Sequence, residues 1–418
     1  MNPRLAAASV AVALITSAIG PWARPQAATT AVPRATLTVA SPLLLPGAVD
    51  SNSPLVWDLD DGQRQLFVLT SHDGQPSVSA GPAVDRLTGT SEITLLPHPG
   101  HGVWMEAVVT DEVETWYGFY HNEWPASACG RDDRFVPRIG AALSIDRGAT
   151  WQDLGIVLQA TQSSTACDST NRYVIGGVGD LSVMLDHDKR FLYIFYSQYQ
   201  RQREAQGVAV ARLLWADRDR PAGRVTLWRN GTWEPNAGRR ELIADIPGTM
   251  RRRLEWTYPA ATPLVATVQA WHDTDDKVDA FWGPAVHWNT ALEQYVMLLN
   301  RAKDEDYAQE GIYVSFAPTL DDPSLWSTPE KILTGGKWYP QVVGSTLGIG
   351  TDKIAGASAR FFMSGRSDWM INFFRRCLPG EILATEDTGH TEPRLRPWGQ
   401  TFRFVRPHPG RRLPQRAA

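Results

Sequence analysis

The sequence lacks the features that define several common classes of protein. Its 418 residues contain three cysteines, and no CxxC, HExxH or clustered His/Cys spacing, so we expect no transition-metal site. The net charge of −4 includes no basic excess that would attract nucleic acid or an anionic membrane surface. Amphipathic helical periodicity is also scarce, which argues against a helical fold.

The N-terminus has the pattern of an export signal. Arg4 supplies a positive charge, residues 5–19 are apolar and small, and Ala27, Ala28 and Ala31 are small residues suited to cleavage. The apolar run is short and Ala-rich for a membrane span. We therefore predict a signal peptide over residues 1–31 and a secreted or periplasmic protein without membrane attachment after cleavage. An uncleaved anchor is the alternative.

The three cysteines allow one disulfide in an exported protein. Cys129 and Cys167 both lie in loops rich in Gly, Ser and Asp, and we expect them to pair. The odd cysteine, Cys377, is then left over and is expected to be buried.

What the sequence does contain is a series of short apolar segments separated by Gly, Asp, Asn and Pro turns, which is typical of an all-β protein. Five units share an entrance, a strand, a turn and a second strand. They begin at Asp50, Trp104, Gly179, Trp282 and Ser358, with "WYPQVVG" at Trp338 as an alternative entrance to the fifth. Repetition of this kind predicts a single five-bladed β-propeller over residues 35–405, followed by a disordered basic tail over 406–418.

Three further segments bear on the predicted propeller. "SIDRGATW", Ser144 to Trp151, matches an Asp-box, a turn in which Asp146 caps backbone N–H groups and Trp151 packs on the sheet. The long stretch 217–281 is expected to wall a pocket. "QTFRFV" near the C-terminus either closes the ring beside blade five or pairs with "ATLTVA" at Ala35.

Propeller geometry brings together residues that are distant in the sequence. The entrances of the innermost strands and the exits of the next strands meet on one face. Asp50, Glu106 and Asp180 occupy the first three entrances, while His121 and Glu123 follow a strand exit. Carboxyl groups that converge on a polar substrate suit acid/base catalysis when one stays protonated and another is ionised.

This arrangement resembles the five-bladed propeller glycosidases of the family-43 arabinanase and xylosidase type. The resemblance covers roughly Asp50 to Phe374 and lies in the blade rhythm and entrance motifs. It implies that Asp50 is the base or nucleophile, that Glu106 and Asp180 share the acid and pKa-tuning roles, and that cleavage inverts the anomeric configuration. The sequence departs from the family where Trp282 precedes Gly-Pro, because the family commonly has Glu there.

The remaining candidates would line the pocket. His121 and Glu123 are expected to bind substrate, and so is Arg138, which would pair with a carboxylate. Weaker candidates for the pocket wall are Trp282, Arg301, Glu255 and His272.

We therefore expect a carbohydrate-active propeller that cleaves an oligo- or polysaccharide and requires no cofactor. A structural calcium ion in the central channel is left open. The first alternative is a sugar-binding propeller without catalysis, which the Trp before Gly-Pro favours. The second is a sialidase-like hydrolase, suggested by the Asp-box and Arg138, although five blades and the lack of a third arginine argue against it.

Overall fold

The computed structural model describes residues 31–111, 115–244, 252–266, 280–304 and 306–376, all within one compact unit. Nearly all of the predicted export signal lies outside the described residues. So do His272, Cys377, the predicted strand "QTFRFV" and the basic tail. Within the described ranges, no helix is long and apolar enough to cross a membrane.

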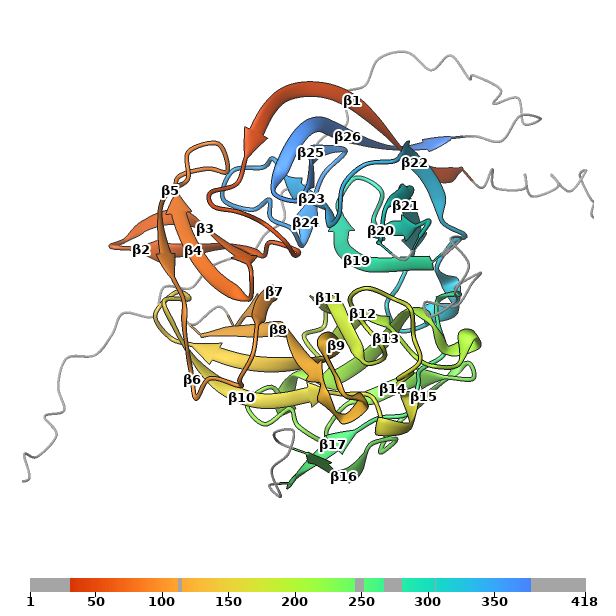
Figure 1. The fold of residues 1–418 in the computed structure, drawn as a ribbon. Coiled ribbons are helices and arrows are strands. Elements are labelled where there is room, and N and C mark those ends of the chain that lie inside the picture. The colour runs from red at the N-terminus through yellow and green to blue at the C-terminus, as the bar shows by residue number, and fades with distance from the viewer. Residues whose placement is uncertain (1–30, 112–114, 245–251, 267–279, 305, 377–418) are drawn as a thin grey trace, which may run out of the picture. The chain divides into compact units, whose positions relative to one another are not determined.

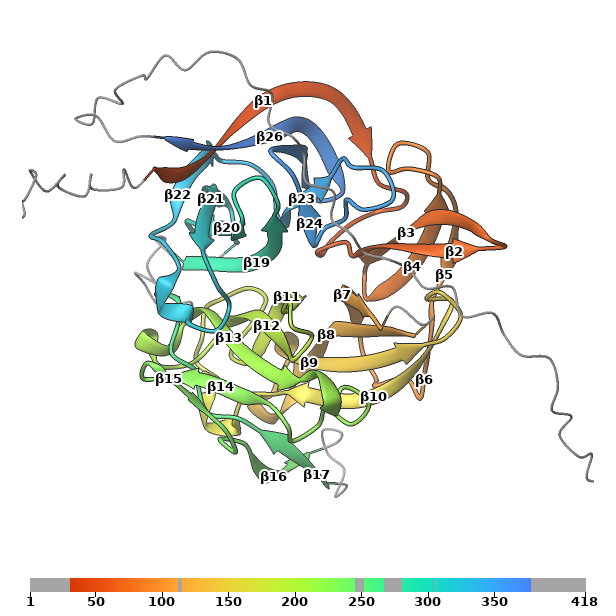
Figure 2. The same cartoon turned by 180° about the vertical axis from the view of Figure 1, so that it is seen from behind.

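Five antiparallel sheets surround a common axis, and the innermost strand of each lies nearest the axis (Figure 1). The predicted all-β, five-bladed propeller is therefore confirmed. Figure 2 shows the same ring from behind. Blade one contains β2 (Leu55–Asp60), β3 (Gln63–His72), β4 (Gln75–Gly81) and β5 (Thr88–Glu92). Blade two contains β7 (Val103–Thr110), β8 (Trp116–Ala126), β9 (Arg131–Ser144) and β10 (Thr150–Leu158), and β6 (Thr94–Leu96) pairs with β10.

The next two blades are extended by short additional strands. Blade three contains β11 (Val178–Leu185), β12 (Phe191–Gln198), β13 (Gly207–Leu214), β14 (Thr226–Arg229) and β15 (Thr232–Glu234), and β18 (Val265–Ala266) pairs with β13. Blade four contains β19 (Ala280–Asn289), β20 (Gln294–Ala302), β21 (Gln309–Ala317) and β22 (Glu330–Thr334), and β24 (Ile354–Ala355) pairs with β19.

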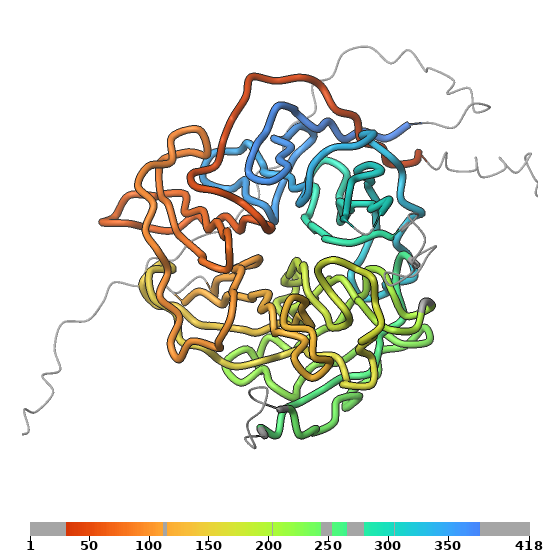
Figure 3. The backbone as a smooth tube through the Cα atoms, in the orientation of Figure 1, coloured from red at the N-terminus to blue at the C-terminus, as the bar shows by residue number. Residues whose placement is uncertain are grey.

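Blade five joins the two ends of the described chain. It contains β23 (Pro340–Gly344), β25 (Ser358–Met363), β26 (Arg366–Arg376) and β1 (Val32–Leu44). The alternative entrance at Trp338 is correct, since β23 is the innermost strand. The segment at Ala35 pairs with β26 along most of its length, so the N-terminal strand closes the ring; the tube in Figure 3 shows β1 beside β26.

Turn chemistry explains why these strands fold back on themselves. Both residues of the Asp61-Gly62 turn between β2 and β3 have positive φ, 47° and 77°. Asp73-Gly74 and Asn230-Gly231 adopt the same left-handed pair. Two-residue hairpins of this kind require φ above zero at both positions, which Asn, Asp and Gly tolerate best.

One buried apolar cluster fills each interface between neighbouring blades. Phe67 and Trp116 join blades one and two, for example, and Val343 and Leu66 join blades five and one. Three further clusters join blades two to three, three to four and four to five. Because one of these clusters lies between the last and first blades, apolar burial favours a closed ring.

The segment 217–281 is arranged differently from the prediction. Its hairpin of β16 (Arg239–Ala244) and β17 (Arg252–Thr257) lies at the outer edge of the ring, against β10 (Figure 1). None of the residues described in this segment lines the cavity at the axis, so the described part of the segment does not form the predicted pocket wall. "GTMRRRLEWTYPA", expected as a loop, contains β17.

The turn at Ser144–Trp151 is held by side-chain hydrogen bonds. Asp146 Oδ1 accepts from the Thr150 N–H at 2.9 Å, and Ser144 Oγ accepts from the Gly148 N–H at 2.9 Å. Trp151 is buried and donates from Nε1 to the Gly148 carbonyl at 2.9 Å. The turn connects β9 to β10, and none of its residues lines the cavity at the axis.

Candidate active site

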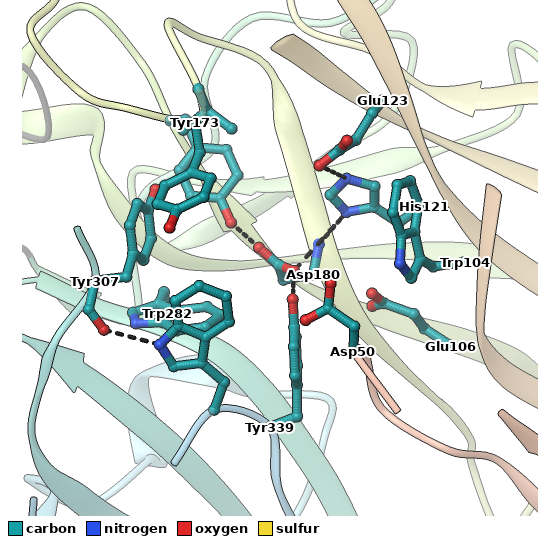
Figure 4. A pocket seen from close by; sticks show the side chains of 13 residues that line it. Asp50, Trp104, Glu106, His121, Glu123, Tyr173, Asp180, Trp282, Tyr307 and Tyr339 are labelled. Atoms are coloured by element: carbon teal, nitrogen blue, oxygen red, sulfur yellow. Dashed lines mark hydrogen bonds and ion pairs between the residues drawn. The ribbon is translucent and has the colours of Figure 1, made fainter. Parts of the chain in front are cut away.

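A cavity of about 100 Å³ lies where the entrances of the innermost strands meet near the axis (Figure 4). Four acidic residues and a histidine line one part, and a group of aromatic residues lines another. The lining residues are Asp50, Trp104, Glu106, His121, Glu123, Tyr173, Val174, Asp180, Tyr199, Trp282, Tyr307, Trp338 and Tyr339.

The innermost strands of blades two, three and four each carry a register shift. The register shifts between Met105 and Ala107 in β7, and between Gly179 and Leu181 in β11, so Glu106 and Asp180 are the additional residues. A bulge re-aims the side chain of the additional residue. Asp180 has φ of 41°, a conformation that non-glycine residues seldom adopt. Local backbone geometry therefore turns both carboxyl groups toward the cavity.

Each bulge is held by the blade before it. A side chain near the exit of a second strand accepts a hydrogen bond from the backbone of the next innermost strand. These bonds run from Met105 N to Ser71 Oγ (3.0 Å), from Asp180 N to His121 Nδ1 (3.0 Å) and from Gly283 N to Ser197 Oγ (2.9 Å). Blade packing and site geometry are consequently coupled.

Glu106 is the most deeply buried of the four carboxyl groups, with 2% of its surface exposed. Its Oε2 accepts a hydrogen bond from the Leu181 backbone N–H in the neighbouring blade. Burial, and then the charge of Asp180, raises the pKa of Glu106 well above its usual value. Glu106 is therefore held in place by the backbone of blade three.

Asp180 is fixed by two tyrosines. Tyr199 donates its hydroxyl to Oδ2, and Tyr339 donates to Oδ1 at 3.3 Å. Both carboxyl oxygens of Asp180 therefore have a hydrogen-bond donor. Asp180 also contributes to the raised pKa values of Asp50, Glu106 and Glu123, which places it at the electrostatic centre of the site.

Asp50 precedes β2, and its main-chain N–H donates to the Ser71 carbonyl at 2.8 Å. No hydrogen bond to its carboxyl group is found within the described residues, and Figure 4 shows this group facing the space beside Asp180. Burial and the charge of Asp180 raise the pKa of Asp50 from 3.8 to about 6. At neutral pH it is ionised and available as a base.

Glu123 lies in β8, two residues beyond His121. Its side chain is 25% exposed, and His121 Nε2 lies 3.8 Å from its Oε1. Burial, followed by the charges of Asp180 and Asp50, raises the pKa of Glu123 from 4.5 to about 8. Burial lowers the pKa of His121, which keeps the imidazole neutral. Because Nδ1 accepts from Asp180, the ring proton is on Nε2 and faces Glu123.

Aromatic side chains form the other part of the cavity. Trp282 makes edge-to-face contacts with Tyr307, Trp338 and Tyr339, with ring centroids 5.2, 5.9 and 5.6 Å apart. Flat aromatic faces are suited to packing against the apolar faces of sugar rings. Tyr307, Trp338, Tyr339 and Tyr173 were not predicted as site residues; only the "WYPQVVG" entrance motif pointed to two of them.

The segment that carries Tyr173 is attached to blade two. Phe135 N donates to the Tyr173 carbonyl at 2.9 Å, and Ile175 N donates to the Phe135 carbonyl at 3.0 Å. The predicted disulfide between Cys129 and Cys167 is confirmed, with the two Cα atoms 5.2 Å apart. These links hold Tyr173 and the adjacent Val174 at the cavity.

The structure brings together most of the predicted site residues. Asp50, Glu106, Asp180, His121, Glu123 and Trp282 all line the cavity. Arg138 and Arg301 do not line it, and their substrate-binding roles stay predictions. Arg138 is buried beneath Trp124 and donates to Asn122 at 2.8 Å and toward Glu255 at 3.4 Å. Arg301 donates to the Tyr313 hydroxyl at 2.9 Å.

One cluster could contribute ligands to a metal ion. Atoms of Glu106, His121 and Asp180 lie within 4.8 Å of one another. Calcium usually takes six to eight oxygen ligands, and these three side chains supply two carboxylates and a nitrogen that already accept hydrogen bonds. The cluster is therefore a poor calcium site by itself, and the question of a channel calcium stays open.

Comparison with known proteins found likeness in structure alone. No family model and no curated protein sequence matches the chain. Similar solved structures include an endo-arabinase from Bacteroides thetaiotaomicron, with 11% identity and a TM-score of 0.43 over 79% of this chain and 96% of that one. The exo-β-1,3-galactanase of Phanerochaete chrysosporium has 11% identity and a TM-score of 0.41, over 81% of this chain and 64% of that one.

A third similar structure is the catalytic domain of a Coprinopsis cinerea GH62 α-L-arabinofuranosidase. It has 8% identity and a TM-score of 0.40, over 81% of this chain and 96% of that one. These structures belong to the glycosidase propellers that the sequence resembles. At such identities and TM-scores the likeness transfers no activity to this chain.

Proposed function

We propose that this chain is an exported glycoside hydrolase that removes a terminal sugar from an oligo- or polysaccharide. The observation that carries the proposal is the convergence of four carboxyl groups from three blades on one cavity at the axis. The small volume of the cavity, about 100 Å³, supports a single terminal sugar unit over an internal stretch of polymer.

The electrostatics support catalysis. Burying like-charged carboxyl groups beside one another opposes folding, and binding a neutral sugar does not require it. A hydrolase does require one ionised and one protonated carboxyl group at the same pH. Asp50, with its pKa raised to about 6, is the proposed base that activates water. The inverting course is an expectation from the family-43 resemblance.

The second candidate function is sugar binding without turnover. The aromatic group around Trp282 favours it, because stacking platforms alone can hold a sugar. A sialidase-like activity is less well supported, since no arginine lines the cavity among the described residues. Without a cationic partner, the carboxyl groups would repel an anionic sugar.

The proposal is tested with a panel of oligosaccharides and aryl glycosides, including arabinosides, xylosides and galactosides. We expect the wild type to release sugar from at least one, in the presence of EDTA as in its absence. Asp50→Asn is expected to lower kcat/KM by about 10²–10⁴ because it removes the base. Asp61→Asn is the matched control, since Asp61 lies in an exposed turn and Asn tolerates its φ of 47°.

Two results would argue against the proposal in different ways. Binding of a glycan by the wild type with no turnover would favour the sugar-binding function. Hydrolysis that is unchanged in Asp50→Asn would remove Asp50 from the mechanism.

A further inference from the structure

The four carboxyl groups of the cavity fall into two groups of two when their hydrogen-bond partners are compared. Asp180 accepts hydrogen bonds from Tyr199 and Tyr339, and Glu106 accepts one from the Leu181 backbone. No hydrogen bond to the carboxyl group of Asp50 or of Glu123 is found within the described chain. Two carboxyl groups are therefore fixed by the fold, and two are free to meet a substrate.

We infer that Glu123 is the general acid that protonates the leaving oxygen, with Asp50 as its partner base. This inference rests on the proposed hydrolase function. It moves the acid role away from Asp180 and Glu106, to which the sequence resemblance assigned it, and gives Glu123 a role in catalysis in place of substrate binding alone.

Asp180 is poorly suited to donate a proton. Each of its two carboxyl oxygens already accepts a tyrosine hydroxyl, so neither is free to approach a leaving oxygen. Its backbone is also fixed, since its N–H donates to His121. Asp180 acts instead as a fixed negative charge that raises the pKa values of its neighbours.

Glu106 is unsuited for a different reason. It is 2% exposed and accepts from the Leu181 N–H between blades two and three, so a leaving oxygen has little access to it. A general acid must come within about 2.6–3.2 Å of the atom that it protonates. Glu106 can tune the charges of the cavity without touching the substrate.

Glu123 meets the requirements that the other two fail. Its side chain lines the cavity, retains 25% exposure and lies beside the neutral imidazole of His121. Figure 4 shows Glu123 and Asp50 extending from different directions, with the His121 ring between them in this view. The raised pKa of Glu123, about 8, leaves it protonated at neutral pH while Asp50 is ionised.

The reaction balances with these two groups and water. Glu123 transfers its carboxyl proton to the glycosidic oxygen as the C–O bond breaks, and the bonding electrons go to that oxygen. The water oxygen forms the new bond to the anomeric carbon, and Asp50 takes the water proton. The products are the free sugar and the leaving alcohol, and proton exchange with solvent restores both groups.

Leaving-group dependence tests the assignment. A general acid matters for a poor leaving group such as a sugar hydroxyl, and little for an acidic phenol that departs as its anion. For Glu123→Gln we expect kcat/KM to fall by about 10²–10⁴ on the natural-type oligosaccharide but by less than about tenfold on the matching 2,4-dinitrophenyl glycoside. Asp180→Asn should lower both rates by similar factors.

Control variants separate catalysis from folding. Glu123→Asp keeps a donor and should restore part of the oligosaccharide activity, while Glu92→Gln at an exposed blade-one strand should change neither rate. Equal losses on both substrates, or no loss on the oligosaccharide, would overturn the assignment of Glu123. If the wild type hydrolyses neither substrate class, the hydrolase proposal fails and the assignment fails with it.

Discussion

The chemistry of single residues in this site follows from burial and like charge. Glu123 and Asp50 each have a pKa raised first by burial and then by nearby carboxylates, Asp180 foremost. The same factors that prepare these groups for proton transfer oppose folding whenever the groups are ionised. Function and stability are therefore expected to conflict at Glu123.

Glu123→Gln should make the protein more stable at alkaline pH. The pKa of Glu123 is raised from 4.5 to about 8, so the folded protein retains a proton that the unfolded chain releases across that interval. The contribution of Glu123 to stability therefore falls as pH rises from about 4.5 to about 8, and the Gln variant lacks this loss. We expect a gain of about 1–3 kcal/mol at pH 8.5 and none at pH 4, measured by urea unfolding. An equal effect at both pH values would contradict the electrostatic explanation.

The sequence predicted site residues correctly where the position of a residue in the repeated unit decides which way its side chain faces. Asp50, Glu106 and Asp180 occupy equivalent entrances, and all three reach the cavity. Arg138 lies within β9, the third strand of blade two, where Asn122 and Trp124 hold its guanidinium away from the cavity. The direction of the Arg138 side chain depends on packing between strands, which cannot be inferred from a single sequence.

Among the elements, the bulges in β7 and β11 have the greatest effect on the site. Each adds one residue to an innermost strand, and that residue carries the carboxyl group. The bulge in β11 depends on close packing of Gly179 against His121, because a Cβ at Gly179 would lie 2.6 Å from His121 Nδ1. The small residue allows the imidazole to accept the Asp180 N–H.

Gly179→Ala should damage the site more than the fold. His121 is buried and has little room to yield, so the added methyl group should displace the ring from the Asp180 N–H. We expect a loss of about 1–3 kcal/mol in unfolding free energy, as for other overpacked cores. The value of kcat/KM should fall by at least tenfold. Denaturant unfolding and hydrolysis assays measure the two effects.

Gly356→Ala is the matched control for this substitution. Its Cβ would meet only Thr290 Oγ1, at 3.8 Å. We therefore expect the unfolding free energy and kcat/KM to stay near their wild-type values. If Gly179→Ala retains wild-type activity, the packing of Gly179 against His121 does not set the site geometry.

Element-level prediction was accurate for the repeated units and less so for the segments between them. The five strand–turn–strand units and the Asp61-Gly62 turn have strong local signals, because apolar alternation and turn residues act over a few positions. No comparable local signal in the sequence predicts where the hairpin of β16 and β17 packs. It packs at the outer edge of the ring against β10, which is distant in the sequence and therefore gives no local signal.

At the scale of the whole molecule, the ring is closed by its N-terminal strand. β1 pairs with β26 from Val32↔Arg376 to Leu44↔Arg366, with one register shift. The only partner predicted for "ATLTVA" was "QTFRFV", and β26 was missed because nothing local in the segment indicates a partner more than 300 residues away. Closure matters for function, since Tyr339 of blade five donates to Asp180 of blade three across the cavity.

The proposed acid and base have different pKa values because residues from three blades meet in the complete ring. Asp50 comes from blade one, Glu123 from blade two and Asp180 from blade three, and only their convergence separates the pKa values of the proposed base and acid. Activity should therefore require an ionised Asp50 and a protonated Glu123 at once.

The most direct test of this account is the pH dependence of wild-type kcat/KM on an oligosaccharide substrate. We predict a bell-shaped profile that falls below about pH 6, as Asp50 becomes protonated, and above about pH 8, as Glu123 ionises. The alkaline limb should disappear in Glu123→Gln, and the acidic limb in Asp50→Asn. A wild-type profile without one of these limbs, or limbs unchanged in the variants, would contradict the account.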